Sequence, residues 1–98
     1  MTKFLKTNYN QTIAYNKIDG EKLGIVFLSG LKSDMTGQKA VALEEWAVEN
    51  NHSFLRFDYS GHGISSGKFN DFVISDWILD AKTIITKLTK GCLLYTSD

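Results

Sequence analysis

The sequence of 98 residues contains no proline, a single cysteine and a single arginine. With Cys92 as the only cysteine, no disulfide can form within the chain, which suits a reducing compartment. The charged side chains balance to a net charge of zero, and the positive ones are lysines apart from Arg56. The sequence has no basic stripe with interleaved aromatic residues, so we expect no nucleic-acid partner.

The sequence also lacks any long apolar run. The first twelve residues, MTKFLKTNYNQT, have no apolar segment of a secretory signal, and no stretch approaches the length of a membrane span. Together with the single cysteine, these features predict a cytoplasmic protein with no membrane span. A hydrophobic content of 43% is ordinary for a globular protein, and 98 residues allow one small domain.

The pattern of apolar residues predicts an α/β protein. Residues 23–28, LGIVFL, are apolar without alternation, which is typical of a strand buried on both faces. The predicted elements are strands at 3–7, 12–18 and 23–28, a helix at 38–50, a strand at 53–57, a helix at 73–90 and a strand at 92–95. This order, β-β-β-α-β-α-β, predicts an α/β sandwich with a mostly parallel sheet.

The two predicted helices carry further signals. Thr36 or Asp34 could cap the start of the first helix, and Gly91 is a natural residue just beyond the end of the second. Trp46 and Trp77 each fall on an apolar stripe at helical spacing. We therefore expect both tryptophans in the core rather than in a binding platform.

Residues 57–67, FDYSGHGISSG, form the most informative motif of the chain. Within them, GISSG has the G-x-S-x-G spacing of a serine-hydrolase nucleophile elbow, with Ser65 as the serine. An elbow requires a buried strand that runs directly into the first glycine and a helix directly after the last one. Here the strand ends at Asp58, and polar loop residues follow Gly67. We therefore interpret the motif as a glycine-rich loop, mobile and with no sheet beneath it, in which Ser65 is not the nucleophile.

Other residues that could carry chemistry lack partners in the sequence. His62 has no carboxylate or nucleophile at a defined spacing and is interpreted as a loop histidine. His52 and Cys92 have no companions at metal-ligand spacing, so we expect no metal site. A nucleotide-binding module that uses Gly61 and Gly63 remains an alternative, although the loop does not open a helix directly.

With this layout, the chain resembles the N-terminal part of the α/β-hydrolase superfamily over about residues 12–91. Residues 24–31, GIVFLSGL, resemble the third strand and its oxyanion loop, and residues 57–67 resemble the D-x-x-G-x-G-x-S-x-G loop after the fourth strand. Ser75, Asp76, Trp77 and Asp80 resemble the start of the next helix. Residues 31–57 are most similar to the subgroup of palmitoyl-protein thioesterases and acyl-glucuronide esterases with their bacterial relatives.

The resemblance implies a serine hydrolase that acts on small-molecule acyl esters or thioesters without a cofactor. It also implies that the backbone N–H of Leu31 donates to the oxyanion of the tetrahedral intermediate. Ser29 stands before Gly30 where most members have histidine, and it either anchors its loop or is inert. Three residues of the glycine-rich loop would have structural roles: Asp58, which would accept loop N–H groups, Gly61 and Gly63.

The C-terminal residues depart from the family pattern. Residues 92–98, CLLYTSD, contain no glycine, whereas the family's fifth strand runs into an elbow of the form G-x-S-x-G-G. This tail looks more like read-through into foreign sequence than a natural fifth strand. We therefore expect residues 1–98 to be a partial domain, truncated before the elbow and lacking the nucleophile, the acid and the histidine of the triad. Such a chain would be inactive alone, or a non-functional truncated product.

Overall fold

The computed structural model describes residues 2–30, 32–89 and 93–97. The predicted order of strands and helices is confirmed, with boundaries that differ by a few residues. The elements are β1 (Lys3–Lys6), β2 (Thr12–Ile18), β3 (Lys22–Leu28), α1 (Gln38–Glu49), β4 (His52–Phe57), a 3-10 turn (Phe69–Asp71), α2 (Ile74–Leu88) and β5 (Leu93–Ser97). The predicted helix end at Gly91 and the residue Cys92 lie outside the described residues.

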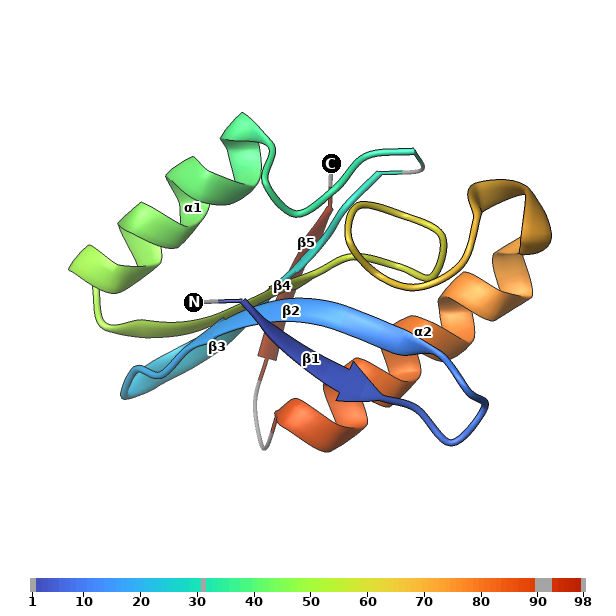
Figure 1. Ribbon diagram of the computed structural model, residues 1–98. Coiled ribbons are helices and arrows are strands. Elements are labelled where there is room, and N and C mark those ends of the chain that lie inside the picture. Colours follow the sequence, from blue (N-terminus) through green and yellow to red (C-terminus); the bar gives the residue numbers. More distant parts are fainter. Residues whose placement is uncertain (1, 31, 90–92, 98) are drawn as a thin grey trace.

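The strands form one mixed sheet in the order β1-β2-β4-β3-β5 (Figure 1). The strands that alternate with helices, β4, β3 and β5, are parallel to one another, whereas β1 pairs antiparallel with β2 and β2 pairs antiparallel with β4. Two of the four pairings are thus parallel. The antiparallel half consists of the first two strands together with their junction to β4.

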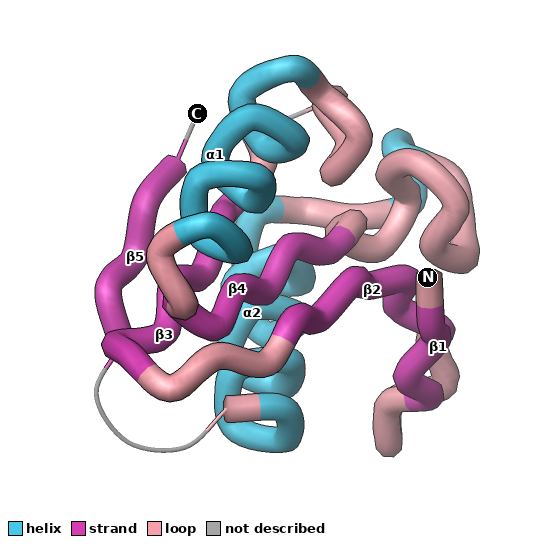
Figure 2. Tube along the Cα trace, turned by 90° about the vertical axis from the view of Figure 1, so that its left-hand side faces the viewer, coloured by secondary structure: helices cyan, strands magenta, loops and turns pink. Residues whose placement is uncertain are grey.

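The two helices cover opposite faces of the sheet (Figures 1 and 2). Because successive strand residues point to opposite faces, β3 and β4 each contribute to two apolar clusters. The cluster under α1 contains Ile25, Phe27, Ala40, Ala47 and Phe54. The cluster under α2 contains Ile13, Val26, Leu55, Phe57 and Ile84. Burial of residues 24–27 on both faces explains why this stretch is apolar without alternation, whereas Leu23 at the start of β3 is 41% exposed.

The environments of the two tryptophans differ. Trp77 on α2 is 8% exposed, which confirms the prediction of a core residue. The same prediction for Trp46 is wrong, because its side chain is 47% exposed and its ring stacks on His52 at a centroid distance of 5.2 Å. The side of α1 that faces the sheet is lined by the small residues Ala40 and Ala47, and Trp46 lies beside this stripe.

The predicted cap of α1 is also wrong. Gly37 occupies the N-cap position, and no side chain makes a capping hydrogen bond there. The carboxylate of Asp34 instead accepts the N–H of Thr36 at 2.9 Å and its hydroxyl at 2.5 Å, closing a turn before the helix. These bonds from Thr36 lower the pKa of Asp34. The two residues expected at the cap therefore bond to each other.

Candidate active-site loops

Two loops meet at the edge of the sheet where the parallel strands β3 and β4 end. The β3 loop, residues 29–37, leads into α1, and the β4 loop, residues 58–68, leads toward α2. The two loops lie next to each other (Figure 1), and hydrogen bonds join them. Because ligands of open α/β sheets bind beyond the carboxyl ends of parallel strands, this edge is the candidate functional site.

The carboxylate of Asp58 accepts one hydrogen bond from each of the two loops. Its side chain is buried, Oδ1 accepts the N–H of Met35 at 2.8 Å, and Oδ2 accepts the N–H of Ile64 at 3.1 Å. Burial raises the pKa of Asp58, while the bonds from Met35 and Ile64 oppose that rise. Both carboxylate oxygens are thus engaged by loop donors, which is the bonding expected of a structural carboxylate.

His62 makes a second connection between the loops. Its Nε2 lies 2.9 Å from the backbone nitrogen of Lys32, and Nδ1 lies 3.1 Å from the carbonyl oxygen of Ser60. Because the Lys32 N–H is a donor, Nε2 is the acceptor and Nδ1 carries the proton. The sequence analysis identified His62 only as a loop histidine. Nothing in the motif indicates that its ring contacts Lys32.

Two glycines allow the β4 loop to curl around Asp58. Gly61 and Gly63 have φ values of +74° and +48°, in the left-handed region that favours glycine. A Cβ atom at Gly61 would lie 2.9 Å from the backbone of Lys68, and one at Gly63 would collide with the Asp58 carboxylate. The path of the loop therefore requires glycine at both positions.

Ser65, the serine of the G-x-S-x-G match, is buried and fully engaged by backbone groups. Its hydroxyl donates to the carbonyl oxygen of Asp58 at 2.6 Å and accepts the N–H of Ala14 at 2.8 Å. Next to it, Ser66 bonds the backbone of Thr12 through its own backbone N–H and its hydroxyl. The expectation of a mobile loop with no sheet beneath it is therefore wrong, because these serines fasten the loop to the start of β2.

The β3 loop contains the residues assigned to the oxyanion hole by resemblance. Ser29 is buried, and its hydroxyl oxygen has no hydrogen-bond partner in the described part of the chain. The carbonyl oxygen of Gly30 accepts the N–H of Ser33 at 3.0 Å, which closes a tight turn. Leu31, the expected oxyanion donor, lies outside the described residues.

The glycine-rich loop does not have the arrangement of a dinucleotide site. The N–H of Gly61 donates to the carbonyl oxygen of Ser66 at 2.8 Å, so it is turned into the loop. The next long helix, α2, begins only at Ile74, after the 3-10 turn. A pyrophosphate at Gly61 and Gly63 would therefore find no helix N-terminus in the loop.

The sequence analysis did not predict an ion pair, Arg56–Glu44, that contacts the β3 loop at Met35. Arg56 on β4 donates from Nη1 to the carbonyl oxygen of Met35 at 2.6 Å. Its Nε and Nη2 donate to the two carboxylate oxygens of Glu44 on α1, at 3.3 and 3.0 Å. The signal available in the sequence was Arg56 itself, a charged residue between Leu55 and Phe57 in an otherwise buried strand. Such a residue needs partners when it is buried.

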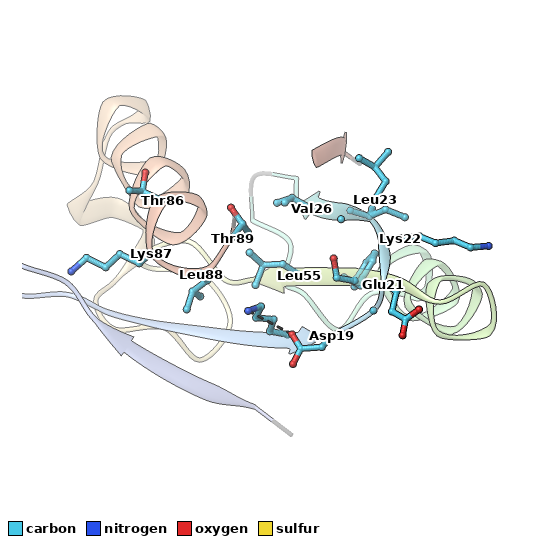
Figure 3. A pocket seen from close by; sticks show the side chains of 16 residues that line it. Asp19, Glu21, Lys22, Leu23, Val26, Leu55, Thr86, Lys87, Leu88 and Thr89 are labelled. Atoms are coloured by element: carbon cyan, nitrogen blue, oxygen red, sulfur yellow. Dashed lines mark ion pairs between the residues drawn. The ribbon is translucent and has the colours of Figure 1, made fainter. Parts of the chain in front are cut away.

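A hollow of about 690 Å³ lies at the opposite edge of the sheet (Figure 3). It is bounded by the turn before β3, the side chains of Val26 and Leu55, and the last turn of α2. A smaller hollow of about 420 Å³ adjoins the β3 loop and the start of α1, between Phe27 and Lys32. Only the smaller one is at the carboxyl edge, so the larger hollow lies outside the candidate site.

The part of the chain that the structure describes contains neither a metal-binding cluster nor a membrane-spanning helix. Across residues 2–30, 32–89 and 93–97, no group of three His, Cys, Asp or Glu side chains could hold a metal ion. None of the helices that the structure describes is long and apolar enough to cross a membrane.

The sheet order, the two helices and the paired loops define the class of protein. The chain belongs to the α/β-hydrolase superfamily and corresponds to an N-terminal part of that fold. Its relatives include "Palmitoyl-protein thioesterase ABHD10, mitochondrial" of Rattus norvegicus, with 39% identity over 88 residues. The match covers 90% of this chain and 30% of the rat protein. The Homo sapiens protein of the same name is 40% identical over 79 residues, which cover 81% of this chain and 26% of that protein.

Solved structures agree with this assignment. The structure of "Alpha/beta hydrolase domain-containing protein 10 from mouse" superimposes with a TM-score of 0.96 at 34% identity, covering 100% of this chain and 39% of that one. An esterase from Exiguobacterium antarcticum has a TM-score of 0.77 at 19% identity over 99% of this chain and 34% of its own, which shows the fold alone. No protein-family model matches the sequence.

The comparisons contradict the prediction of a cytoplasmic protein, because the relatives are named as mitochondrial proteins. The prediction depended on the lack of an apolar segment at the N-terminus. Mitochondrial transit peptides are amphipathic rather than apolar, so that criterion separates secreted from non-secreted proteins and does not identify the compartment.

Proposed function

We propose that this chain supplies the N-terminal third of a serine hydrolase that cleaves acyl esters or thioesters. In this proposal the chain provides the first strands of the sheet and the oxyanion loop, with the backbone N–H of Leu31 as a donor. The nucleophile, the acid and the histidine come from sequence that follows β5. The identity to relatives named thioesterases supports the substrate class.

The observation that carries the proposal is the register of β5. β5 lies parallel to β3, with Ser97 opposite Leu28 at the carboxyl end of both strands. Neighbouring strands are about 4.8 Å apart, so a chain that continued beyond Ser97 would emerge beside Ser29 and Gly30. An elbow at that point would bring its serine close to the β3 loop, as acyl transfer with an oxyanion hole requires.

The hydrogen bonds around the β3 loop support the same function. Stabilisation of an oxyanion requires donors that are fixed before the reaction begins. The β3 loop is held at Lys32 by His62 and at Met35 by Asp58 and Arg56. A loop anchored within its turn and again just after it is suited to present backbone N–H groups in one orientation.

The first test is the reading frame that encodes the chain. We expect the frame to continue beyond codon 98, directly after β5, with a G-x-S-x-G motif within about ten residues. The full-length protein should then hydrolyse p-nitrophenyl esters and acyl thioesters, and replacing the serine of that motif by alanine should abolish turnover. A continuation that lacks the motif would overturn the proposal.

The second test uses the 98-residue chain alone. Because it lacks the triad in this proposal, the purified chain should not turn over p-nitrophenyl esters. The matched control is the Ser65→Ala variant, since Ser65 is the serine with elbow spacing. Turnover by the chain above that of Ser65→Ala would show that the loop serine is reactive, contrary to the proposal.

A further inference from the structure

Lys32 has a backbone conformation that is unusual for its residue type. Its φ is +62°, in the left-handed region that side chains other than glycine rarely adopt. Lys32 directly follows Leu31, and its N–H donates to Nε2 of His62 at 2.9 Å. Strained backbone conformations persist only where neighbouring groups hold them, and they are concentrated at functional sites. The contact between Lys32 and His62 is therefore a candidate functional contact.

The imidazole of His62 is itself held in a fixed orientation. The side chain is buried, and Nδ1 is in contact with the carbonyl oxygen of Ser60 at 3.1 Å. Three aromatic rings meet it at steep angles, with centroid distances of 5.8 Å to Tyr59, 5.2 Å to Phe69 and 5.3 Å to Trp77. The direction of the Nε2 lone pair is therefore determined by packing before any substrate binds.

The surroundings of Lys32 also hold its side chain. Lys32 Nζ lies 4.9 Å from the centroid of the Phe69 ring, and Phe69 stacks on Trp77 at a centroid distance of 5.3 Å. Trp77 Nε1 donates to the same Ser60 carbonyl oxygen that faces His62, at 2.9 Å. The residues around His62 therefore form one connected unit that reaches from α2 to the β3 loop.

We propose that His62 is a positioning residue for the oxyanion hole, acting through the backbone of Lys32. This inference rests on the proposed function. Asp58 and Arg56 hold the β3 loop at Met35, near α1, whereas His62 holds it at the residue next to Leu31. Without an acceptor at Nε2, the Lys32 N–H loses its partner and the backbone at Lys32 is free to leave its left-handed conformation. His62 does not touch the substrate in this proposal.

The test uses the full-length protein and three substitutions of His62. His62→Gln retains an acceptor near the position of Nε2, His62→Asn retains one only near Nδ1, and His62→Phe fills the aromatic surroundings without an acceptor. Since a misplacement of about 1 Å can cost about a hundredfold in rate, we expect kcat to fall about tenfold to a hundredfold in His62→Phe and His62→Asn. KM should stay within about twofold, and His62→Gln should recover most of kcat.

A matched control is the other histidine, His52. It lies at the start of β4, where Nδ1 contacts the carbonyl oxygen of Leu23 and the ring stacks on Trp46, away from both loops. His52→Phe should leave kcat unchanged. If His62→Phe does not fold, the comparison of His62→Gln with His62→Asn still decides the matter. Equal kcat values for these two would overturn the proposal, because only the glutamine reaches Lys32.

Hydrogen exchange gives a readout that is independent of turnover. The amide of Lys32 should exchange faster in His62→Asn than in the wild type and return to slow exchange in His62→Gln. Unchanged exchange in His62→Asn would overturn the positioning role even if kcat fell. A full-length wild type with no hydrolase activity would overturn the proposed function, and the exchange rates would then still show whether His62 holds this loop.

Discussion

The hydroxyl of Tyr9 donates a hydrogen bond of 2.5 Å to the buried carboxylate of Asp80, which is 71 positions away in the chain. The second oxygen of Asp80 accepts the backbone N–H of Ser60 at 2.7 Å. One carboxylate on α2 thus joins the turn between β1 and β2 to the β4 loop. Burial, together with the bond to Asp80, raises the pKa of Tyr9 to about 12.

Replacing Tyr9 by phenylalanine tests this connection. The substitution leaves a buried Asp80 oxygen without its donor, so the free energy of unfolding at pH 7 should fall by about 1–3 kcal/mol. The pKa of Tyr9 is higher in the folded protein than its ordinary value of 10, so this stabilisation is complete below pH 10 and is lost as the pH rises through about 12.

The measurement is urea denaturation of wild type and Tyr9→Phe between pH 7 and pH 12. The difference between the two should shrink above pH 10. Tyr15→Phe is the control, because the Tyr15 hydroxyl makes no hydrogen bond within the residues that the structure describes. Equal losses for the two phenylalanine variants would contradict the role of the Asp80 bond.

The sequence predicted the order of the elements because each depends on a local pattern. The unbroken apolar run at residues 23–28 predicts a buried strand whatever lies next to it in the fold. Helical spacing identifies α2 in the same way. Local pattern failed for Trp46, because the sheet covers only the narrow side of α1 lined by Ala40 and Ala47.

The interactions of the candidate site could not be read from the sequence, since they join residues that are distant in the chain. His62 and Lys32 are 30 positions apart, and Ser65 and Ala14 are 51 positions apart. Their bonds depend on the sheet order, which brings β2 and β3 to either side of β4. The glycine motif indicates that a loop is present, but it does not indicate which backbone groups that loop will hold.

The glycine at position 63 should be essential for the β4 loop. In Gly63→Ala the methyl group would collide with the Asp58 carboxylate, and alanine is unfavourable at a φ of +48°. We expect the free energy of unfolding to fall by about 2–4 kcal/mol. Gly37→Ala is the matched control, because φ there is −62° and the new Cβ would approach only the Asp34 carbonyl oxygen, at 3.9 Å. Denaturation curves that shift equally for both variants would contradict this account.

The ion pair between Arg56 and Glu44 should contribute measurably to stability. The side chains are 11% and 15% exposed, and the guanidinium engages both carboxylate oxygens and the Met35 carbonyl. Lysine cannot reproduce this fork, so Arg56→Lys should cost about 1–3 kcal/mol of unfolding free energy.

A double-mutant cycle of Arg56→Lys with Glu44→Gln measures the interaction energy between these two side chains. We expect a coupling energy of about 1–2 kcal/mol. The exposed pair of Lys17 and Asp19, at 3.6 Å, is the internal comparison and should show no measurable coupling. A coupling no larger than that of the exposed pair would mean that Arg56 stabilises the fold only through Met35.

Substitution of Ser65 separates the structural role of the G-x-S-x-G match from a catalytic one. In Ser65→Ala the buried N–H of Ala14 loses its acceptor and the carbonyl oxygen of Asp58 loses a donor, so the free energy of unfolding should fall by about 1–3 kcal/mol. Ser75→Ala, at an exposed position on α2, should change it little. In the full-length protein, kcat measured where Ser65→Ala is fully folded should remain within about threefold of the wild type, because a hydroxyl bonded on both sides by the backbone has no role in attack. A loss of about a thousandfold or more, with the fold intact, would instead identify Ser65 as the nucleophile.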